Sequence, residues 1–508
     1  MAKTYLGLEL GSTRIKAVAI DEAFQTVSSG GYTWASSYTD GIWTYPLEQV
    51  WVGLRRALED IENRETVCCL GISGMMHGYL AFDRDWNLLT PFRTWQNTIT
   101  AQAAQELTEL FGFNVPQRWS IAHLYQAVLN GEAHVSQVAH ITTLAGFVHH
   151  ALTGENCLGI GEASGMFPID SAALTYDREM LEKLRERLRE KGLALDPETL
   201  LPRVLPAGAD AGRLTEAGAR LLDGLLPAGL PLAPPEGDAG TGMTATNAVA
   251  PGTGNVSAGT SIFAMVVLEK PLSRVYPEID MVTTPSGRPV AMVHCNNCTA
   301  DMNGWVSLFG QLLSLFGRNT EPGELFPKLY QKSLEGAADC GGITVYNYSA
   351  GEPITGFDQG RPMVVRDPAR ALRLEDFLRA QLYSTLASLA AGMELLRQER
   401  VVITRLMGHG GLFKTPVVGQ RYLAAATDSP VTVMETAGEG GPYGMALLAA
   451  YRQQRGDQSL EDFLERQVFV HAKKVCLNPD PADAAGFRAY LTRFLRGLPA
   501  ERAAVEYL

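Results

Sequence analysis

The sequence predicts an α/β protein built from two similar units that face each other across a cleft. Three observations lead to this fold class. The chain has 508 residues, which exceeds the usual length of one domain. Two stretches, 5–20 and 255–267, each contain two apolar runs joined by a turn of small and hydroxyl residues. Each is followed by an amphipathic helix pattern and then by an apolar run that ends in glycine. This order of elements, rather than sequence identity, indicates a duplication, and we place the domains at 1–247 and 248–508.

Composition and charge limit the possible partners. Apolar residues make up 46% of the chain, which is enough for sizeable cores. The 43 Lys and Arg residues against 55 Asp and Glu give a net charge of −12. Such an acidic surface argues against general binding to nucleic acid or to anionic membranes. The chain shows neither a secretory signal pattern nor an apolar run of about 18 residues, so we expect a cytoplasmic protein.

The seven cysteines are scattered along the chain, which is unlike a disulfide framework. Cys295 and Cys298 form a CxxC that directly follows His294. No second CxxC completes a zinc site, so core or loop thiols are the favoured interpretation.

The first half opens with a predicted hairpin. Tyr5–Leu10 reads as a buried strand, Gly11, Ser12 and Thr13 begin a turn, and Ile15–Ile20 reads as a second strand with Lys16 at its start. A turn of small residues, hydroxyls and free N–H groups can hold a phosphate. Taken alone, the turn fits an ordinary hairpin better.

A helix and a strand follow the hairpin. The apolar spacing over 46–61 predicts a one-faced helix, and Val67–Ile72 reads as a buried strand. This strand runs into Ser73–Gly78, which contains Met76 and His77. Polar side chains at such strand ends commonly line sites in open α/β sheets. His77 is therefore a site candidate, with a hydrogen-bonded turn histidine as the alternative.

The region 101–235, which precedes Asp238 in the sequence, is predicted to be mainly helical. Leu152–Glu155 looks like a helix end with a glycine stop, and Glu216–Leu222 like a small helix. Asp238 is a lone carboxylate among glycines ahead of a helix-compatible run. An acid near phosphate-type turns indicates phosphoryl transfer, and a helix N-cap is the alternative.

The second half repeats this order. The turn at Gly259, Thr260 and Ser261 joins two apolar runs, and the spacing over Leu374–Arg397 predicts a long helix. Val401–Ile403 reads as a strand that leads to Gly408–Gly411. The chain has no GxxxxGK[ST] motif and no GxGxxG between a strand and a helix. A nucleotide site here must therefore use another architecture.

In chain order, these motifs resemble the FGGY family of carbohydrate kinases along essentially the whole chain. Each motif is short, but their order and spacing together are specific. They are Leu8–Lys16, Ser73–Gly78, Trp95–Thr98, Leu152–Gly154, Glu162–Gly165, the connector Leu201–Gly229, Gly237-Asp238, Gly259–Ser261, Tyr348–Glu352, Gly408–Gly411 and Glu439–Pro442.

The resemblance implies two ribonuclease-H-like domains of the actin/hexokinase-like ATPase superfamily, which flank a catalytic cleft. It also implies ATP with Mg²⁺, transfer of the γ-phosphoryl group to a ketose or polyol hydroxyl, domain closure and a homodimer. Asp238 would be the general base and Glu9 would hold hydrated Mg²⁺. The sugar contacts would be Met76, His77, Trp95, Asn97 and Asp238. The nucleotide contacts would be Gly11, Ser12, Thr13, Lys16, Gly259, Thr260, Ser261, Gly410 and Gly411.

Several residues depart from the family pattern. Glu9 replaces the usual Asp, and Glu162 also stands where an Asp is common. On the sugar side, Met75 replaces a glutamine, Gln96-Asn97 replaces Asn-Asp, and Ala239 replaces an asparagine. A pentulose such as xylulose is the leading substrate. A kinase for another ketose or polyol (ribulose, fuculose, erythrulose or glycerol type) and a catalytically faded ATP- and sugar-binding sensor remain alternatives.

Overall fold

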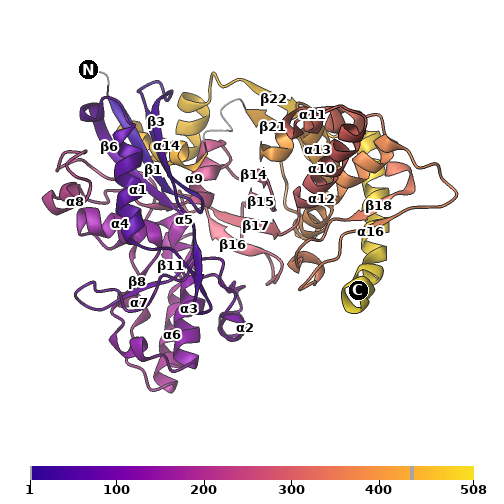
Figure 1. The fold of residues 1–508 in the computed structure, drawn as a ribbon. Coiled ribbons are helices and arrows are strands. Elements are labelled where there is room, and N and C mark those ends of the chain that lie inside the picture. Colours follow the sequence, from indigo (N-terminus) through magenta and orange to yellow (C-terminus); the bar gives the residue numbers. More distant parts are fainter. Residues whose placement is uncertain (1–2, 435–439) are drawn as a thin grey trace.

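The computed structural model describes residues 3–434 and 440–508 and folds them into two lobes, each built around a mixed sheet (Figure 1). The predicted loop residue Glu439 lies outside the described residues. The first sheet has the strand order β13-β6-β1-β2-β3. Its strands are β1 (Thr4–Leu10), β2 (Arg14–Ile20), β3 (Thr26–Thr33), β6 (Val67–Gly74) and β13 (Glu236–Gly237).

The second sheet has the strand order β16-β17-β15-β14-β20-β21-β22. Its strands are β14 (Thr253–Ala258), β15 (Ile262–Val267), β16 (Asp280–Thr283), β17 (Pro289–Cys295), β20 (Arg405–Gly410), β21 (Val431–Met434) and β22 (Lys474–Leu477).

The two sheets share a five-strand pattern. In the first sheet, β2 pairs antiparallel with both β1 and β3, and β6 and β13 run parallel to β1 on its other side. In the second sheet, β14, β15 and β17 take the antiparallel places, and β20 and β21 the parallel ones. The predicted fold class, two facing α/β units of one type, is thereby confirmed.

Helices and short strand pairs complete the first lobe. The helices are α1 (Glu48–Glu59), α2 (Ala101–Phe111), α3 (Ser120–Leu129), α4 (Leu144–Thr153), α5 (Ile160–Ala163), α6 (Arg178–Glu190), α7 (Pro197–Leu200), α8 (Glu216–Leu221) and α9 (Asp238–Ala245). The short strands are β4 (Ser37–Thr39), β5 (Ile42–Thr44), β7 (Leu80–Phe82), β8 (His140–Thr142), β9 (Cys157–Gly159), β10 (Ile169–Asp170), β11 (Thr175–Tyr176) and β12 (Arg203–Leu205). The predicted glycine stop is present, because Gly154 caps α4 with a φ of +80°.

The second lobe is organised around α12, whose predicted apolar positions are buried except for half-buried Phe377. Its helices are α10 (Ala300–Leu315), α11 (Pro322–Ser333), α12 (Leu374–Gln398), α13 (Val418–Thr427), α14 (Gly441–Gln454), α15 (Leu460–Phe463) and α16 (Pro481–Tyr507), and its remaining strands are β18 (Thr344–Tyr346) and β19 (Met363–Val365). Among the described residues, no helix is both long and apolar enough to cross a membrane.

The strand predicted to lead from Val401 into Gly408–Gly411 is present as β20, but it begins only at Arg405, so the predicted start at Val401–Ile403 is wrong. The Val401 N–H bonds to the Leu396 carbonyl and closes the end of α12. Val402 is largely exposed, so this apolar run caps a helix instead of entering the sheet.

α14 links the two halves of the sequence in space. It belongs to the second half but packs against β1 of the first sheet, where Figure 1 shows it among the indigo strands. Gly7 and Gly71 allow this approach, because a Cβ at either position would overlap atoms of α14. Gly444 allows α14 to lie equally close to α9. These contacts hold the start of α14 beside Asp238. The predicted domain boundary between residues 247 and 248 stays a prediction.

Candidate active site

Asp238 is the first residue of α9, and Gly237 holds the N-cap position. Its Oδ1 accepts a hydrogen bond from the Met76 N–H at 3.1 Å. The side chain is open to solvent, yet the protein that surrounds its carboxyl group raises the pKa above the usual range, while the Met76 bond opposes that shift. A raised pKa makes the ionised carboxylate a stronger base. The position therefore suits proton abstraction.

Glu9 lies near the end of β1 and is buried. Its Oε2 is 3.6 Å from the Lys16 Nζ across the hairpin. Its Oε1 lies against Gly441, where any Cβ would overlap it. Burial raises the pKa of Glu9 to about 7; the Lys16 ammonium opposes this shift and the Asp238 carboxylate adds to it.

The residues at this point fit a magnesium ion that arrives with its nucleotide. The described residues contain no group of three or more His, Cys, Asp or Glu side chains that could hold a metal. Mg²⁺ keeps several of its waters and usually binds through one or two carboxylates together with substrate phosphates. Glu9 supplies one carboxylate. Burial is the main cause of its raised pKa, and the neighbouring Asp238 carboxylate adds a smaller contribution that a cation at this point would offset.

Hydrogen bonds from two aromatic residues fix the carbonyl groups of the first predicted phosphate turn. The Gly11 carbonyl accepts a bond from the Trp34 indole N–H, and the Ser12 carbonyl accepts one from the Tyr45 hydroxyl, both at 2.7 Å. The Thr13 carbonyl accepts from the Trp34 backbone N–H at 3.2 Å. Because these carbonyls are engaged, Ser12 and Thr13 can present their donor groups to solvent, where both residues are exposed.

The second predicted phosphate turn is built in the same way. Thr299 donates both its N–H and its hydroxyl to the Gly259 carbonyl, at 3.2 and 2.7 Å. The Cys298 N–H donates to the Thr260 carbonyl at 2.9 Å. Ser261 closes the turn, because its carbonyl accepts from the Gly259 N–H. In both hairpins, therefore, carbonyls of the turn are anchored and the first glycine N–H closes the turn, which leaves the donors of Ser12, Thr13, Thr260 and Ser261 as the candidates for a phosphate.

Gly410 and Gly411 lie beside the second turn. Gly410 pairs with Ala258 in the sheet and has a φ of +98°. A Cβ at Gly410 would overlap the Ala258 carbonyl, so only glycine fits. The glycine at 410 is therefore explained by its close approach to Ala258, and the nucleotide contacts predicted for Gly410 and Gly411 stay a prediction.

A cavity of about 110 Å³ opens between the two lobes at this point. Residues of α9, of the second sheet and of the start of α14 line it, among them Asp238, Gly242, Asn255, Phe263, His409 and Gly441. The predicted base therefore lines a cavity to which both halves of the sequence contribute.

On the sugar side, the structure brings Met76 and His77 next to Asp238. His77 is buried, has a φ of +72°, and its Nδ1 lies 3.1 Å from the Gly165 carbonyl. Its ring stacks on Trp119 at 6.4 Å between centroids. Burial, with a smaller effect of the Arg118 guanidinium, holds the pKa of His77 well below its usual value. A strained, neutral histidine held this firmly is typical of a binding site.

Trp95 and Asn97 lie in the turn that follows β7. The Trp95 side chain is exposed. The Asn97 amide is buried and bound to the backbone of Trp43, accepting from its N–H and donating to its carbonyl, both at 2.8 Å. An aspartate here could accept the Trp43 N–H but could not donate to the Trp43 carbonyl, so the amide of Asn97 is what allows both hydrogen bonds. The sugar-binding roles of both residues stay predictions.

Sequence reasoning missed a second group of residues near His77. Arg118 forms an ion pair with Asp280 of β16, and Asn114 donates to the same carboxylate at 3.0 Å. His294 faces this pair, and burial lowers its pKa to about 4. These residues come from both lobes, so only the folded chain brings them together. The CxxC beside His294 consists of two buried free thiols.

Two further acids lie behind Asp238. Glu236 is buried, and burial raises its pKa to about 8. Burial also raises the pKa of Glu162 well above its usual value, helped by the charge of Asp238. Glu162 belongs to the predicted family motif Glu162–Gly165, whereas the one sequence signal for Glu236 is its neighbour Gly237.

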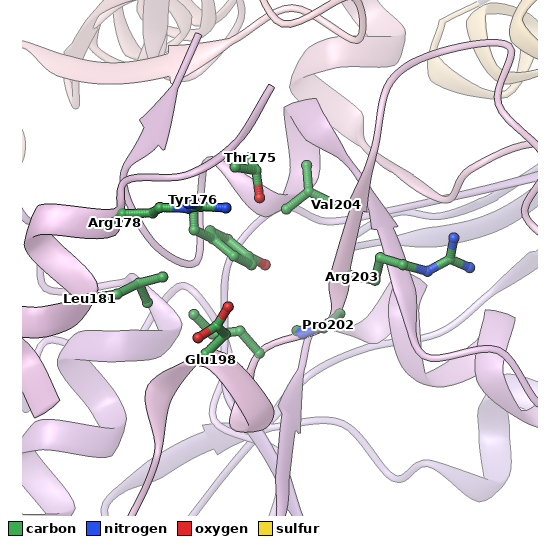
Figure 2. Close-up of a pocket in the computed structure, with 9 residues that line it drawn as sticks. Thr175, Tyr176, Arg178, Leu181, Glu198, Pro202, Arg203 and Val204 are labelled. Atoms are coloured by element: carbon green, nitrogen blue, oxygen red, sulfur yellow. The ribbon is translucent and has the colours of Figure 1, made fainter. Parts of the chain in front are cut away.

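A separate cavity of about 300 Å³ lies between β11, α6, α7 and β12 (Figure 2). Tyr176 projects into it, with Arg178 and Glu198 around the ring. The lining contains none of the predicted site residues and neither phosphate turn. Of these two cavities, the one lined by Asp238 is therefore the candidate active site.

Duplicated sheets, one phosphate-type turn from each and an acid between them define a class, the phosphotransferases of the actin/hexokinase-like ATPase fold. The chain belongs to the FGGY family of carbohydrate kinases: the family's N-terminal domain matches residues 4–241 and its C-terminal domain matches residues 254–452. It is thus a sugar kinase, and ATP is the co-substrate of this family.

Known relatives agree with this assignment. A xylulose kinase of Haemophilus influenzae is 22% identical over 500 residues, which cover 92% of this chain and 93% of the relative. The solved structure of a xyloylose kinase from Brucella ovis superposes with a TM-score of 0.80 at 20% identity, covering 99% of this chain and 100% of that one. Plasmodium falciparum glycerol kinase with ADP gives a TM-score of 0.78 at 14% identity, covering 98% of both chains. The fold is thus shared by kinases of different substrates.

Proposed function

We propose that this chain phosphorylates a pentulose such as xylulose, with Asp238 as the general base. The observation that carries the proposal is the position of Asp238, with Met76 and His77 on one side and the cavity between the lobes on the other. The Haemophilus influenzae relative that matches over 92% of the chain is a xylulose kinase, which favours a ketose over a polyol.

The reaction is an in-line transfer in which the protein mainly positions groups and neutralises charge. Asp238 accepts the proton of a sugar hydroxyl as that oxygen bonds to the γ-phosphorus. The bond from phosphorus to the ADP oxygen breaks, and the electrons leave with ADP. Met76 and His77 orient the sugar, together with the predicted contacts Trp95 and Asn97.

The two turns receive the phosphates. Ser12 and Thr13 from one hairpin and Thr260 and Ser261 from the other offer N–H and hydroxyl donors to the β- and γ-phosphates. Gly11 and Gly259 shape the two turns, because each N–H donates within its own turn, to the Arg14 and Ser261 carbonyls. Gly410 and Gly411 let the backbone approach the nucleoside. Lys16 fixes Glu9, and Glu9 would hold the hydrated Mg²⁺, which neutralises phosphate charge when it is bound.

The test is a substrate panel. The chain is supplied with Mg-ATP and, one at a time, xylulose, ribulose, fuculose, erythrulose, glycerol and gluconate, and ADP release is followed. We expect release to depend on the added sugar and kcat/KM to be highest for a pentulose. If kcat/KM is highest for a polyol, the assignment of a pentulose as the substrate is wrong. ATP binding without sugar-dependent release would favour a sensor and overturn the proposal.

A further inference from the structure

Glu236 is the buried acid that comes two residues before the proposed base. Its Oε1 accepts from the Gly161 N–H at 3.3 Å and its Oε2 accepts from the Glu162 N–H at 2.9 Å. Gly159 and Gly161 make room for it, because a Cβ at either position would overlap its carboxyl group. The side chain therefore fastens β13 to the first turn of α5.

α5 makes two further connections at the centre of the molecule, where Figure 1 shows it between α9 and β16. Just beyond its end, the Gly165 carbonyl holds the Nδ1 of His77 at 3.1 Å. Thr283 of β16 donates its N–H to the Ser164 hydroxyl and its own hydroxyl to the Ile160 carbonyl, both at 3.0 Å. One short helix thus contacts the base segment, the sugar-side histidine and the second lobe.

The contact between α5 and the base segment is tight. The Glu162 carboxyl group lies against Gly237, where a Cβ would overlap its Oε2. Gly237 is the N-cap of α9 and directly precedes Asp238. A shift of α5 must therefore move Gly237, and Asp238 with it, relative to His77.

We propose that Glu236 is a positioning residue for phosphoryl transfer, which ties Asp238 to α5 and so sets the base against the sugar held at His77. This inference rests on the proposed function. It assigns no contact with substrate to Glu236. The carboxyl group acts through two backbone amides, and the relative position of base and sugar is the property that it controls.

A double-mutant cycle tests the proposal. Gly161→Ala pushes a methyl group into the space of the Glu236 carboxyl group, so we expect kcat to fall about tenfold or more and the sugar KM to rise. In a Glu236→Ala background the same methyl group meets no carboxyl group, and its added effect should stay within about twofold. Glu236→Gln, which keeps the size but loses one acceptor, should resemble Gly161→Ala. The KM for ATP should change little in all of them.

The matched control is Glu501→Gln, because Glu501 is also buried and accepts a backbone N–H, from Arg361 at 2.7 Å. It lies in α16, so its loss should lower stability without changing the sugar KM. Equal costs of Gly161→Ala in both backgrounds, or Glu236→Gln kinetics like those of the control, would overturn the positioning role.

Hydrogen exchange of the chain without substrates separates this inference from the proposed function. The Gly161 and Glu162 amides should exchange faster in Glu236→Gln than in the native chain. Unchanged exchange would overturn the tether even if the kinase activity is confirmed. Faster exchange in a chain that shows no sugar-dependent ADP release would leave the tether standing while the proposed function and the positioning role fail.

Discussion

At the scale of single residues, the site depends on acids placed against glycines. Glu9 lies against Gly441, Glu162 against Gly237, and Glu236 against Gly159 and Gly161. Each glycine removes the Cβ that would displace a carboxyl group. Acids can thus be buried close to the phosphate path, and burial raises their pKa values.

Gly441→Ala tests the first of these contacts. The added methyl group must displace the Glu9 carboxyl group or the start of α14, and Glu9 is the proposed magnesium residue. We expect the KM for Mg-ATP to rise about tenfold, a change of about 1.4 kcal/mol. Gly304→Ala is the control, because a Cβ at Gly304 meets nothing within 4 Å. Similar kinetics for the two variants would contradict the role of Glu9.

Glu236 also gives a prediction for pH. Its pKa is raised to about 8 in the folded chain, so the folded state keeps a proton that the unfolded state has lost above pH ~4.5. Stability should therefore fall as pH rises from about 5 to 8, by up to about 1.4 kcal/mol per pH unit. Glu162 and Asp238 face the same space and also have raised pKa values, so the comparison with Glu236→Gln isolates this group. Urea unfolding should show a flatter pH dependence in the variant; identical slopes would contradict the assignment.

Single residues also show where sequence reasoning ended. Asp238 was identifiable because it stands alone among glycines near a phosphate-type turn. Glu236, two positions earlier, was not, because its partners Gly159 and Gly161 lie more than 70 residues away in the chain. The ion pair of Arg118 and Asp280 could not be predicted for the same reason. Contacts between distant segments leave no local pattern.

At the scale of elements, the two hairpins are the repeated functional unit. Both have short turns with anchored carbonyls, and local sequence was enough to predict them. The strand that ends at the glycines was predicted to begin at Val401, which is too early, because apolar content alone does not distinguish a strand from a chain that closes a helix end. The hydrogen bond to Leu396 decides that position.

Removing one anchor from each hairpin tests the shared design. Tyr45→Phe deletes the hydroxyl that holds the Ser12 carbonyl, and Thr299→Val deletes the one that holds the Gly259 carbonyl. A net loss of about 1 kcal/mol per bond predicts an ATP KM raised about fivefold in each variant. The sugar KM should stay unchanged in steady-state kinetics. A variant that changes the sugar KM instead would show that its hairpin does not serve the nucleotide.

At the scale of the whole molecule, the order of elements was sufficient to predict the duplication, and the shared five-strand pattern confirms it. The sequence did not indicate how the halves interlock. α14 packs against the first sheet through glycine contacts. In β16, Asp280 forms an ion pair with Arg118 of the first lobe, and the Thr283 N–H donates to the Ser164 hydroxyl of that lobe. The site is therefore a product of the joined lobes.

Asp280→Asn tests this joint. The change removes the carboxylate that pairs with Arg118, whose carbonyl accepts the Gly78 N–H beside His77. We expect a lower Tm and a fall of about tenfold in kcat/KM for the sugar, since a partly buried charge loses its partner. ATP binding, measured by calorimetry without sugar, should be retained. Unchanged kcat/KM for the sugar would show that the ion pair of β16 does not support sugar binding.

The central claim is that Asp238 takes the proton of the sugar hydroxyl, and Asp238→Asn tests it most directly. Asparagine keeps the shape and can still accept the Met76 N–H, so calorimetry should give sugar and ATP dissociation constants close to those of the native chain. Single-turnover transfer of the γ-phosphoryl group should fall about 10²- to 10⁴-fold, the usual contribution of general base catalysis. Transfer at the native rate by a variant that binds both substrates would contradict the account.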